Sequence, residues 1–313
     1  MLNESLGLEQ FHQELSSVME SLKYPYRIIY VEDGSTDCTL EMLIRLAEKD
    51  PRVTVVELSR NFGHQAALSA GMDIAGADYL ITMDGDGQHP PSLIPDLVSA
   101  VQRGYDMVLT RRMDQQEVPQ AKQWTSRMFY RLLNLIGSTQ LEPGGADFRL
   151  VSAQVAVALR SLPEHHRFLR GMVAWVGFRT TVVEFTPNKR ISGSAKYSIR
   201  KMLGLAMDAV SSFSLVPLQM AMVLGALFLV VALTEVLYVS SIWLRGRGGE
   251  LALGWVSLMF VLLFLGGAVL ITLGIIGLYV GYIFQEVKRR PVFIIRAIHQ
   301  FPTATSTGRP HSG

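Results

Sequence analysis

Charged residues and cysteines are both scarce in this 313-residue chain. Asp, Glu, Lys and Arg make up 18% of the residues, against about 25% in an ordinary soluble domain, and the mean hydropathy is +0.25. The single cysteine, Cys38, excludes an internal disulfide and fits a reducing compartment. The formal net charge of +2 is too small to indicate a nucleic-acid partner. If the uncharged residues are concentrated in long segments, the shortage of charge excludes a wholly soluble protein.

Two such segments lie in the last third of the chain. Residues 209–234 contain no ionisable side chain, and residues 251–285 contain no charged one. A helix needs roughly 20 apolar residues to cross about 30 Å of hydrocarbon. We therefore predict two transmembrane helices, over residues 213–244 and 251–285.

Basic residues set the expected orientation of these helices. Six of them flank the two segments on the side of the remaining chain, whereas the connection between the segments contains two. They are Lys196, Arg200, Lys201, Lys288, Arg289 and Arg290, against Arg245 and Arg247. Because cytoplasmic flanks carry the excess of Lys and Arg, the part of the chain before the two segments and the C-terminus are both expected in the cytoplasm, on a multi-pass protein of the cell (inner) membrane.

Strands and helices alternate in the first part of the chain. Apolar residues at helical spacing predict helices over 6–22, 40–47, 65–74 and 93–101, and β-branched runs predict strands over 27–31, 53–58, 79–83 and 106–110. This alternation predicts an α/β domain with a mainly parallel sheet covered by helices on both faces. Ligands of such sheets bind beyond the carboxyl ends of the strands, where two acidic loops fall.

The second acidic loop, which follows the strand at 79–83, contains Asp84 and Asp86 separated by a glycine. Carboxylates at a strand end suit Mg²⁺ or Mn²⁺ bound together with substrate phosphates. The alternative is an acidic turn without a metal, because Asp and Gly are common in turns.

Residues 84–91, Asp-Gly-Asp-Gly-Gln-His-Pro-Pro, resemble the Asp-x-Asp-x-Gln-x-Pro-Pro motif of family 2 glycosyltransferases that act on polyprenyl phosphates. Segments 31–37, 59–67, 145–150 and 167–171 are similar to other segments of that family, in the same order. The resemblance covers nearly the whole chain. It implies a GT-A domain, and inverting transfer of one sugar to polyprenyl (undecaprenyl or dolichyl) phosphate at the cytoplasmic membrane face.

The resemblance also implies which residues hold the sugar donor. Asp86 and Gln88 are the expected ligands of Mg²⁺ or Mn²⁺, with Asp84 near the metal or the ribose. Asp33 would accept hydrogen bonds from the base or ribose of a nucleotide sugar. Glu32 stands where the family usually has a second aspartate, and we group it with the donor-binding residues.

On the acceptor side, Asp147 resembles the family's catalytic base and joins Asp86 as a catalytic candidate. A phosphate monoester has a second pKa near 6, so the attacking oxygen is already largely anionic. Asp147 therefore either orients the acceptor or accepts a late proton. Arg149 could bind phosphate bidentately. Lys196, Tyr197 and Arg200 match or adjoin the family's element that contacts the lipid phosphate.

These interpretations divide the chain as follows. We expect a GT-A domain at 1–190, a basic loop and interfacial amphipathic helix at 191–212, the two transmembrane helices, and a cytoplasmic tail with a disordered end at 286–313. The expected partners are the nucleotide sugar, polyprenyl phosphate and membrane lipid, and a homo-oligomer is left open. Met1-Leu2-Asn3-Glu4 resembles the end of the turn after the family's first strand, so we expect a native strand to precede Met1.

Two other functions compete with this hypothesis. A catalytically silent membrane scaffold would keep the fold, but the acidic and basic motif residues are intact. A processive polysaccharide synthase would carry a Gln-x-x-Arg-Trp element, which this chain lacks. Four histidines near the motifs, at positions 64, 89, 165 and 166, have no metal-ligand spacing and are interpreted as loop or packing residues.

Overall fold

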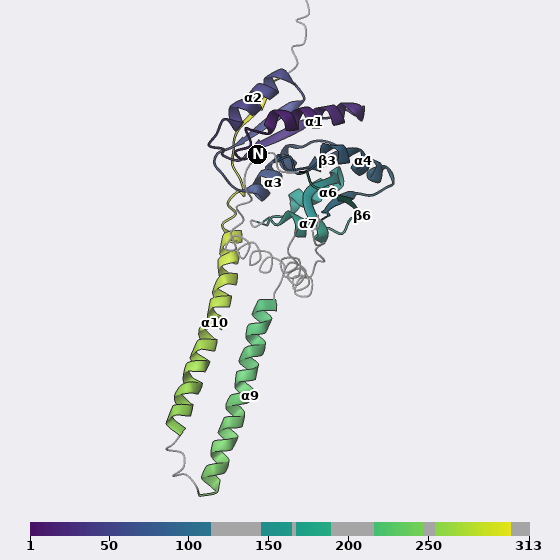
Figure 1. The fold of residues 1–313 in the computed structure, drawn as a ribbon. Helices are drawn as coiled ribbons and strands as arrows, with labels where there is room; N and C mark the ends of the chain where they lie inside the picture. Colours follow the sequence, from purple (N-terminus) through teal and green to yellow (C-terminus); the bar gives the residue numbers. More distant parts are fainter. Residues whose placement is uncertain (114–144, 165–166, 189–215, 247–253, 302–313) are drawn as a thin grey trace, which may run out of the picture. The chain divides into compact units, whose positions relative to one another are not determined.

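The computed structural model describes residues 1–113, 145–164, 167–188, 216–246 and 254–301 (Figure 1). The chain forms two compact units. The first contains the described residues up to 188 together with 291–301, and the second contains 216–246 and 254–290.

The first unit contains two sheets. In the first sheet, β1 (Ile28–Glu32) pairs in parallel with β2 (Val53–Leu58), and β2 pairs antiparallel with β7 (Ile295–Gln300). All six residues of β2 are buried, which explains its nearly continuous apolar, β-branched sequence. The helices α1 (Leu8–Ser21), α2 (Thr39–Lys49) and α3 (His64–Ile74) begin or end within two residues of their predicted positions.

The second sheet has the strand order β3-β5-β4-β6. Its strands are β3 (Tyr79–Thr82), β4 (Met107–Arg112), β5 (Gly145–Ser152) and β6 (Thr180–Phe185). β5 runs antiparallel to both of its neighbours, and β4 pairs in parallel with β6. The elements η1 (Pro91–Leu93), α4 (Ile94–Gln102), α6 (Ala153–Ser161) and α7 (Leu169–Trp175) complete the unit.

The expectation of a mainly parallel sheet is wrong for the part of the chain that the structure describes. Both sheets are mixed, because β5 and β7 each run antiparallel to the strands they contact. Neither strand belongs to the alternating strands and helices before residue 112. Parallel neighbours in a sheet are usually connected by a crossover helix, and this expectation does not apply to β5 and β7. The α/β class itself is confirmed.

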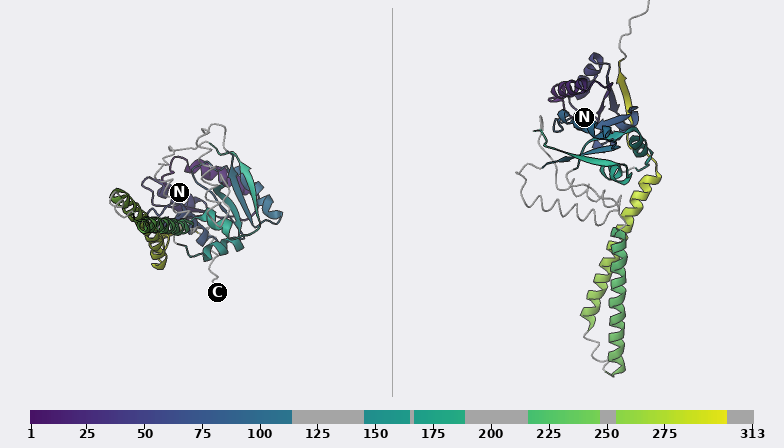
Figure 2. Two further views of the ribbon diagram at one scale, coloured as in Figure 1. Left: turned by 90° about the horizontal axis from the view of Figure 1, so that it is seen from below. Right: turned by 90° about the vertical axis from the view of Figure 1, so that its right-hand side faces the viewer.

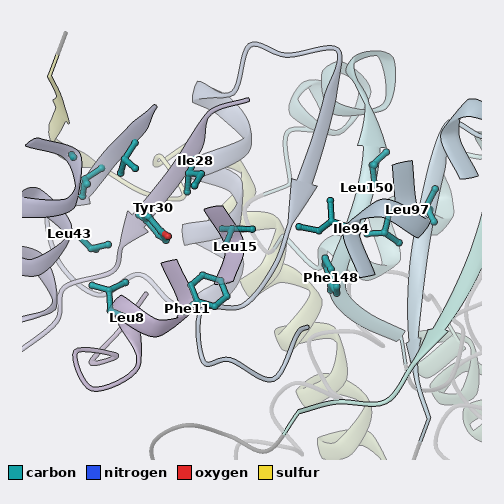
Figure 3. Close-up of a cluster of buried hydrophobic side chains, with 14 of the residues drawn as sticks. Leu8, Phe11, Leu15, Ile28, Tyr30, Leu43, Ile94, Leu97, Phe148 and Leu150 are labelled. Carbon is teal, nitrogen blue, oxygen red and sulfur yellow. The ribbon is translucent and has the colours of Figure 1, made fainter. Parts of the chain in front are cut away.

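One apolar core runs from the first sheet to the second. Leu8, Phe11 and Leu15 of α1 are buried with Ile28 and Tyr30 of β1. The same cluster continues to the second sheet, as Figure 3 shows, through Ile94, Leu97, Phe148 and Leu150. Burial of these side chains, each worth about 1.5–3 kcal/mol, holds both sheets in one unit.

Met1 lies beside the carboxyl end of β1. Its amino group donates to the Val31 carbonyl oxygen at 2.8 Å, and the Asp33 amide donates to the Met1 carbonyl oxygen at 3.0 Å. These two bonds flank Glu32 in the manner of a parallel strand pairing. The Met1 side chain also contacts Gly85 in the loop after β3. The strand expected before Met1 stays a prediction.

The second unit consists of two long helices, α9 (Val216–Leu244) and α10 (Trp255–Val287), which lie side by side (Figure 2). The Phe228 and Phe264 rings meet edge to face, with centroids 5.0 Å apart. Within the described residues, one stretch has the length and hydropathy of a membrane span, Phe264–Val287. Both predicted segments are helical over Val216–Leu244 and from Trp255 onward, while the prediction of two membrane spans is not confirmed.

The structure differs from the prediction of a cytoplasmic tail over residues 286–313. α10 continues to Val287, and β7 joins the first sheet, so residues 295–300 belong with the domain that we had expected to end at residue 190. The sequence contains the reason, because half-buried Ile295, Ala297 and His299 alternate with exposed residues. The predicted interfacial helix at 191–212 and the end of the tail after residue 301 lie outside the described residues.

Candidate active site

The acidic residues predicted from the motifs lie at the ends of three elements of the first unit. Glu32 is the last residue of β1, Asp84 follows β3, and Asp147 is near the start of β5. His64, the first residue of α3, brings two of these carboxylates together. Its Nε2 atom lies 3.1 Å from Oδ2 of Asp147 and 3.4 Å from Oδ1 of Asp84.

The first acidic loop is held by hydrogen bonds to backbone amides. Asp33 is buried, its Oδ1 accepts from the Phe62 amide at 2.7 Å, and its Oδ2 accepts from the Gly63 amide at 3.0 Å. The buried Glu32 carboxylate accepts from the Ser35 amide. Both carboxylates thus fix the loops beside the ends of β1 and β2.

Gly34 allows these two loops to approach each other. Its φ angle is +73°, and a Cβ atom at this position would lie 2.5 Å from the Asn61 nitrogen. A side chain would meet both the left-handed backbone penalty and a backbone clash. The glycine of the 31–37 motif is therefore required by the contact with the 59–63 loop.

The second acidic loop is held by His89. Its Nδ1 accepts from the Asp84 amide at 2.9 Å, and its buried ring stacks on Phe148 with centroids 5.2 Å apart. The ring also meets the edge of Phe185 at 5.7 Å. Burial lowers the pKa of His89 in spite of the nearby Asp84, Asp86 and Asp147 carboxylates. A neutral His89 therefore holds the loop, and its interpretation as a packing residue is confirmed.

Asp84 and Asp86 have the chemistry of a Mg²⁺ or Mn²⁺ site. The Oδ1 atom of Asp84 is buried and accepts no hydrogen bond among the described residues, although Nε2 of His64 lies 3.4 Å away. Mg²⁺ is commonly held by one or two carboxylates together with substrate phosphates, so these residues fit the ion. Gln88 fits less well, because its Oε1 accepts from Arg112 at 3.3 Å. Within the described residues no group of three acidic, His or Cys side chains is assembled for a metal.

Asp147 lies in a cluster of basic side chains. Its side chain is buried, and Arg170 donates to Oδ1 from Nε at 3.2 Å and to Oδ2 from Nη2 at 3.0 Å. Arg149, also buried, donates to Oδ1, and His64 donates to Oδ2. The Gln65 amide lies 3.5 Å from Oδ2. Three cationic or potentially cationic groups thus share one carboxylate.

These contacts decide the protonation state of Asp147. Burial raises the pKa of Asp147, but the hydrogen bond from His64 and the charges of Arg149 and Arg170 outweigh burial and leave the pKa well below its usual range. For His64, burial lowers the pKa, but Asp147 and Asp84 outweigh burial and leave it raised. Asp147 is therefore ionised at neutral pH and is a weak proton acceptor.

The structure thus brings Asp84 and Asp147 together through His64, and it places Glu32 and Asp33 in the loop beside them. Sequence reasoning did not assign His64 or Arg170 to the site. Both residues stand in segments, 59–67 and 167–171, whose resemblance to the family was the available signal. Lys196, Tyr197 and Arg200 lie outside the described residues, as do His165 and His166.

Comparison with known proteins assigns the chain to a family. Residues 2–157 match the family described as Glycosyl transferase family 2. An uncharacterized glycosyltransferase of Synechocystis sp. is 40% identical over 296 residues, which cover 94% of this chain and 92% of that protein. The chain belongs to this family. It is a glycosyltransferase, and the matched residues include every acidic residue of the site.

Other relatives of this family 2 glycosyltransferase carry more specific names. The SfII prophage-derived bactoprenol glucosyl transferase of Shigella flexneri is 37% identical over 303 residues, covering 96% of each chain. Among solved structures, S. aureus TarS 1-349 in complex with UDP is 16% identical, with a TM-score of 0.40 over 66% of this chain and 62% of that one. For TarS 1-349 alone the chain spans 57% of the solved protein, with a TM-score of 0.39.

Proposed function

We propose that this glycosyltransferase transfers a sugar from a nucleotide-diphosphate sugar to polyprenyl phosphate, with inversion at the anomeric carbon. One observation carries the proposal: His64 joins Asp84 of the second acidic loop to Asp147 within a cluster of arginines. Such a cluster can receive an anionic donor and an anionic acceptor side by side. The 37% identity with a protein named bactoprenol glucosyl transferase supports this acceptor class.

The donor is proposed to bind at the acidic loops. Asp84 and Asp86 would hold Mg²⁺ or Mn²⁺, which, when bound, stabilises the negative charge that develops on the departing nucleotide diphosphate. The buried Oδ1 of Asp84, which accepts no hydrogen bond among the described residues, supports this assignment. Glu32 and Asp33 would contact the nucleoside, and they hold the 31–37 and 59–63 loops in place through the Ser35, Phe62 and Gly63 amides.

The acceptor phosphate is proposed to bind at the basic side of Asp147. An oxygen of the phosphate attacks the anomeric carbon as the bond to the nucleotide diphosphate breaks on the opposite face, which inverts the configuration. Because the phosphate is largely dianionic, the attack needs no strong base. We propose that ionised Asp147 orients Arg149 and Arg170 for the acceptor. Lys196, Tyr197 and Arg200 would complete the lipid-phosphate contacts.

The membrane arrangement is also a proposal. We propose that α9 and α10 both cross the cell membrane, that residues 191–212 lie at its interface, and that the catalytic domain faces the cytoplasm. The span-like composition of Phe264–Val287 and the basic residues 288–290 that follow it support this orientation.

A donor screen tests the function. Purified full-length protein is incubated with polyprenyl phosphate, Mn²⁺ and labelled UDP- or GDP-linked sugars, and labelled lipid is the expected product with at least one donor. No labelled lipid from any common donor would refute the transferase proposal and favour the silent scaffold. A product with many linked sugars would instead indicate a processive synthase.

The metal is tested separately. Replacing Asp86 by alanine should abolish the Mn²⁺-dependent signal, because one carboxylate of the proposed pair is lost. Asp96→Ala is the matched control, since Asp96 is an exposed aspartate on α4. Full activity of the Asp86→Ala protein would remove the metal assignment while leaving the transferase proposal standing.

A further inference from the structure

β7 lies far from the site residues in sequence but is bound to the strand that leads into them. It pairs antiparallel with β2 from Thr54↔Gln300 to Leu58↔Ile295. The Ser59 amide then donates to the Ile294 carbonyl oxygen at 2.9 Å, so the pairing continues past the carboxyl end of β2.

Side chains strengthen this pairing at the same end. The Glu57 carboxylate, which is buried, accepts from Nη1 of Arg296 at 3.0 Å and from Nε2 of His299 at 3.1 Å. The Nη2 atom of Arg296 donates to the Ser59 carbonyl oxygen at 3.1 Å. Arg296 therefore binds both a side chain of β2 and the first backbone carbonyl beyond it.

The loop that starts at Ser59 leads directly to the candidate site. Its Phe62 and Gly63 amides bind Asp33, and α3 begins at the next residue with His64, which binds Asp147. A displacement at Ser59 would thus be transmitted within four residues to the Phe62 and Gly63 amides, and through them to the first acidic loop.

We propose that β7 is a positioning element for the loop of residues 59–63, which holds Asp33 of the proposed nucleotide site, and that Arg296 is its positioning residue. The proposal rests on the proposed function for the identity of the ligand, a nucleoside diphosphate. Residues 288–294 alone separate α10 from β7 in the sequence. Residues 288–294 therefore connect the apolar helix α10 directly to β7, the strand that contacts the loop of residues 59–63.

If Arg296 had a purely structural role, its replacement would have a different effect on the loop of residues 59–63. The Arg296 side chain is 62% exposed, and exposed ion pairs contribute little to global stability. If Arg296 only covered the edge of the sheet, its loss would leave the loop unchanged. If it positions Ser59, its loss should loosen the loop without unfolding the domain.

The test compares full-length Arg296→Gln with Arg52→Gln. Arg52 directly precedes β2, at its amino end, pairs with Asp50 and Glu20, and is 39% exposed, so it is a matched control. Arg296→Gln should speed hydrogen exchange of the Phe62 and Gly63 amides and raise the KM for the nucleotide sugar, each by about three- to tenfold, which corresponds to the loss of one ordinary hydrogen bond. The KM for polyprenyl phosphate and the unfolding midpoint should stay at the control values. Arg296→Lys, which keeps a donor to Glu57, should restore part of the effect.

The proposal is overturned if loop exchange in Arg296→Gln equals that of the wild type, or if Arg52→Gln shows the same changes. It is also overturned if both substrates' KM values rise together. Hydrogen exchange requires no turnover, so it still decides the role of β7 if the wild-type protein makes no lipid-linked product. That result would refute the proposed function alone.

Discussion

Replacing Asp147 by asparagine separates the two roles open to this carboxylate. As a proton acceptor, Asp147 would act during the reaction, and its loss would lower kcat in a stably folded protein. As the partner of Arg149, Arg170 and His64, it also holds the resting structure together. Asparagine keeps the shape but removes the charge and turns one acceptor oxygen into a donor amide.

The structure gives the size of the expected effect. Arg149 and Asp147 are 4% and 3% exposed, so the substitution leaves a buried guanidinium without its counter-charge. Breaking a buried pair in this way costs about 3–5 kcal/mol, which lowers the unfolding midpoint by roughly 6–20 °C for a domain of this size. The contacts of Arg170 and His64 add less, because their side chains are 38% and 50% exposed.

The assay is thermal unfolding of full-length protein in detergent, together with kcat for lipid-linked product. Asp96→Asn, on the exposed face of α4, is the control. We expect Asp147→Asn to unfold well below the control and to lose activity. An unfolding midpoint equal to that of the control, with kcat still greatly reduced, would refute the positioning role and favour the proton acceptor.

Two further predictions concern the loops beside Asp147. The raised pKa of His64 means that its stabilising effect is complete below the unfolded pKa of about 6.5 and is lost as the pH rises through the folded pKa. The stability advantage of the wild type over His64→Gln should therefore shrink between pH 6 and pH 9, measured by urea unfolding; a constant gap would contradict the ion pairs. Gly34→Ala should cost at least about 1–2 kcal/mol from its positive φ, and more from the contact with Asn61. It should raise the KM for the nucleotide sugar, while Gly76→Ala, which has open space around it, should not.

The sequence predicted the local elements up to residue 112 well, because each one buries its own periodic face. β2 begins and ends at its predicted residues, 53 and 58, and α3 begins one residue before its predicted start. The strand directions were predicted less well. β5 and β7 pair with strands far away in the sequence, and nothing in their own residues specifies a parallel or an antiparallel neighbour.

In the candidate site, too, the sequence predicted features that depend on neighbouring residues better than contacts between residues distant in the chain. Asp84 and Asp147 were identified from their motifs, and Asp84 was also predicted to lie at the end of a strand. The electrostatic state of Asp147 could not be predicted, because it depends on His64 and Arg170, which are contributed by the starts of two other helices. His64 was interpreted as a loop or packing residue because it has no metal-ligand spacing in the sequence, and its partners Asp84 and Asp147 are distant from it along the chain.

The alternation of side chains along β5 has a consequence for how this enzyme can change during evolution. Asp147 and Arg149 point to one face of the strand and contact each other, whereas Phe148 between them packs into the core against His89. β5 is bonded to a neighbour on each side, so its register cannot slip. A deletion of one residue within the strand would put an aromatic ring among the arginines and a carboxylate into the core. Evolution can therefore substitute residues within β5, but insertions and deletions must occur elsewhere in the chain.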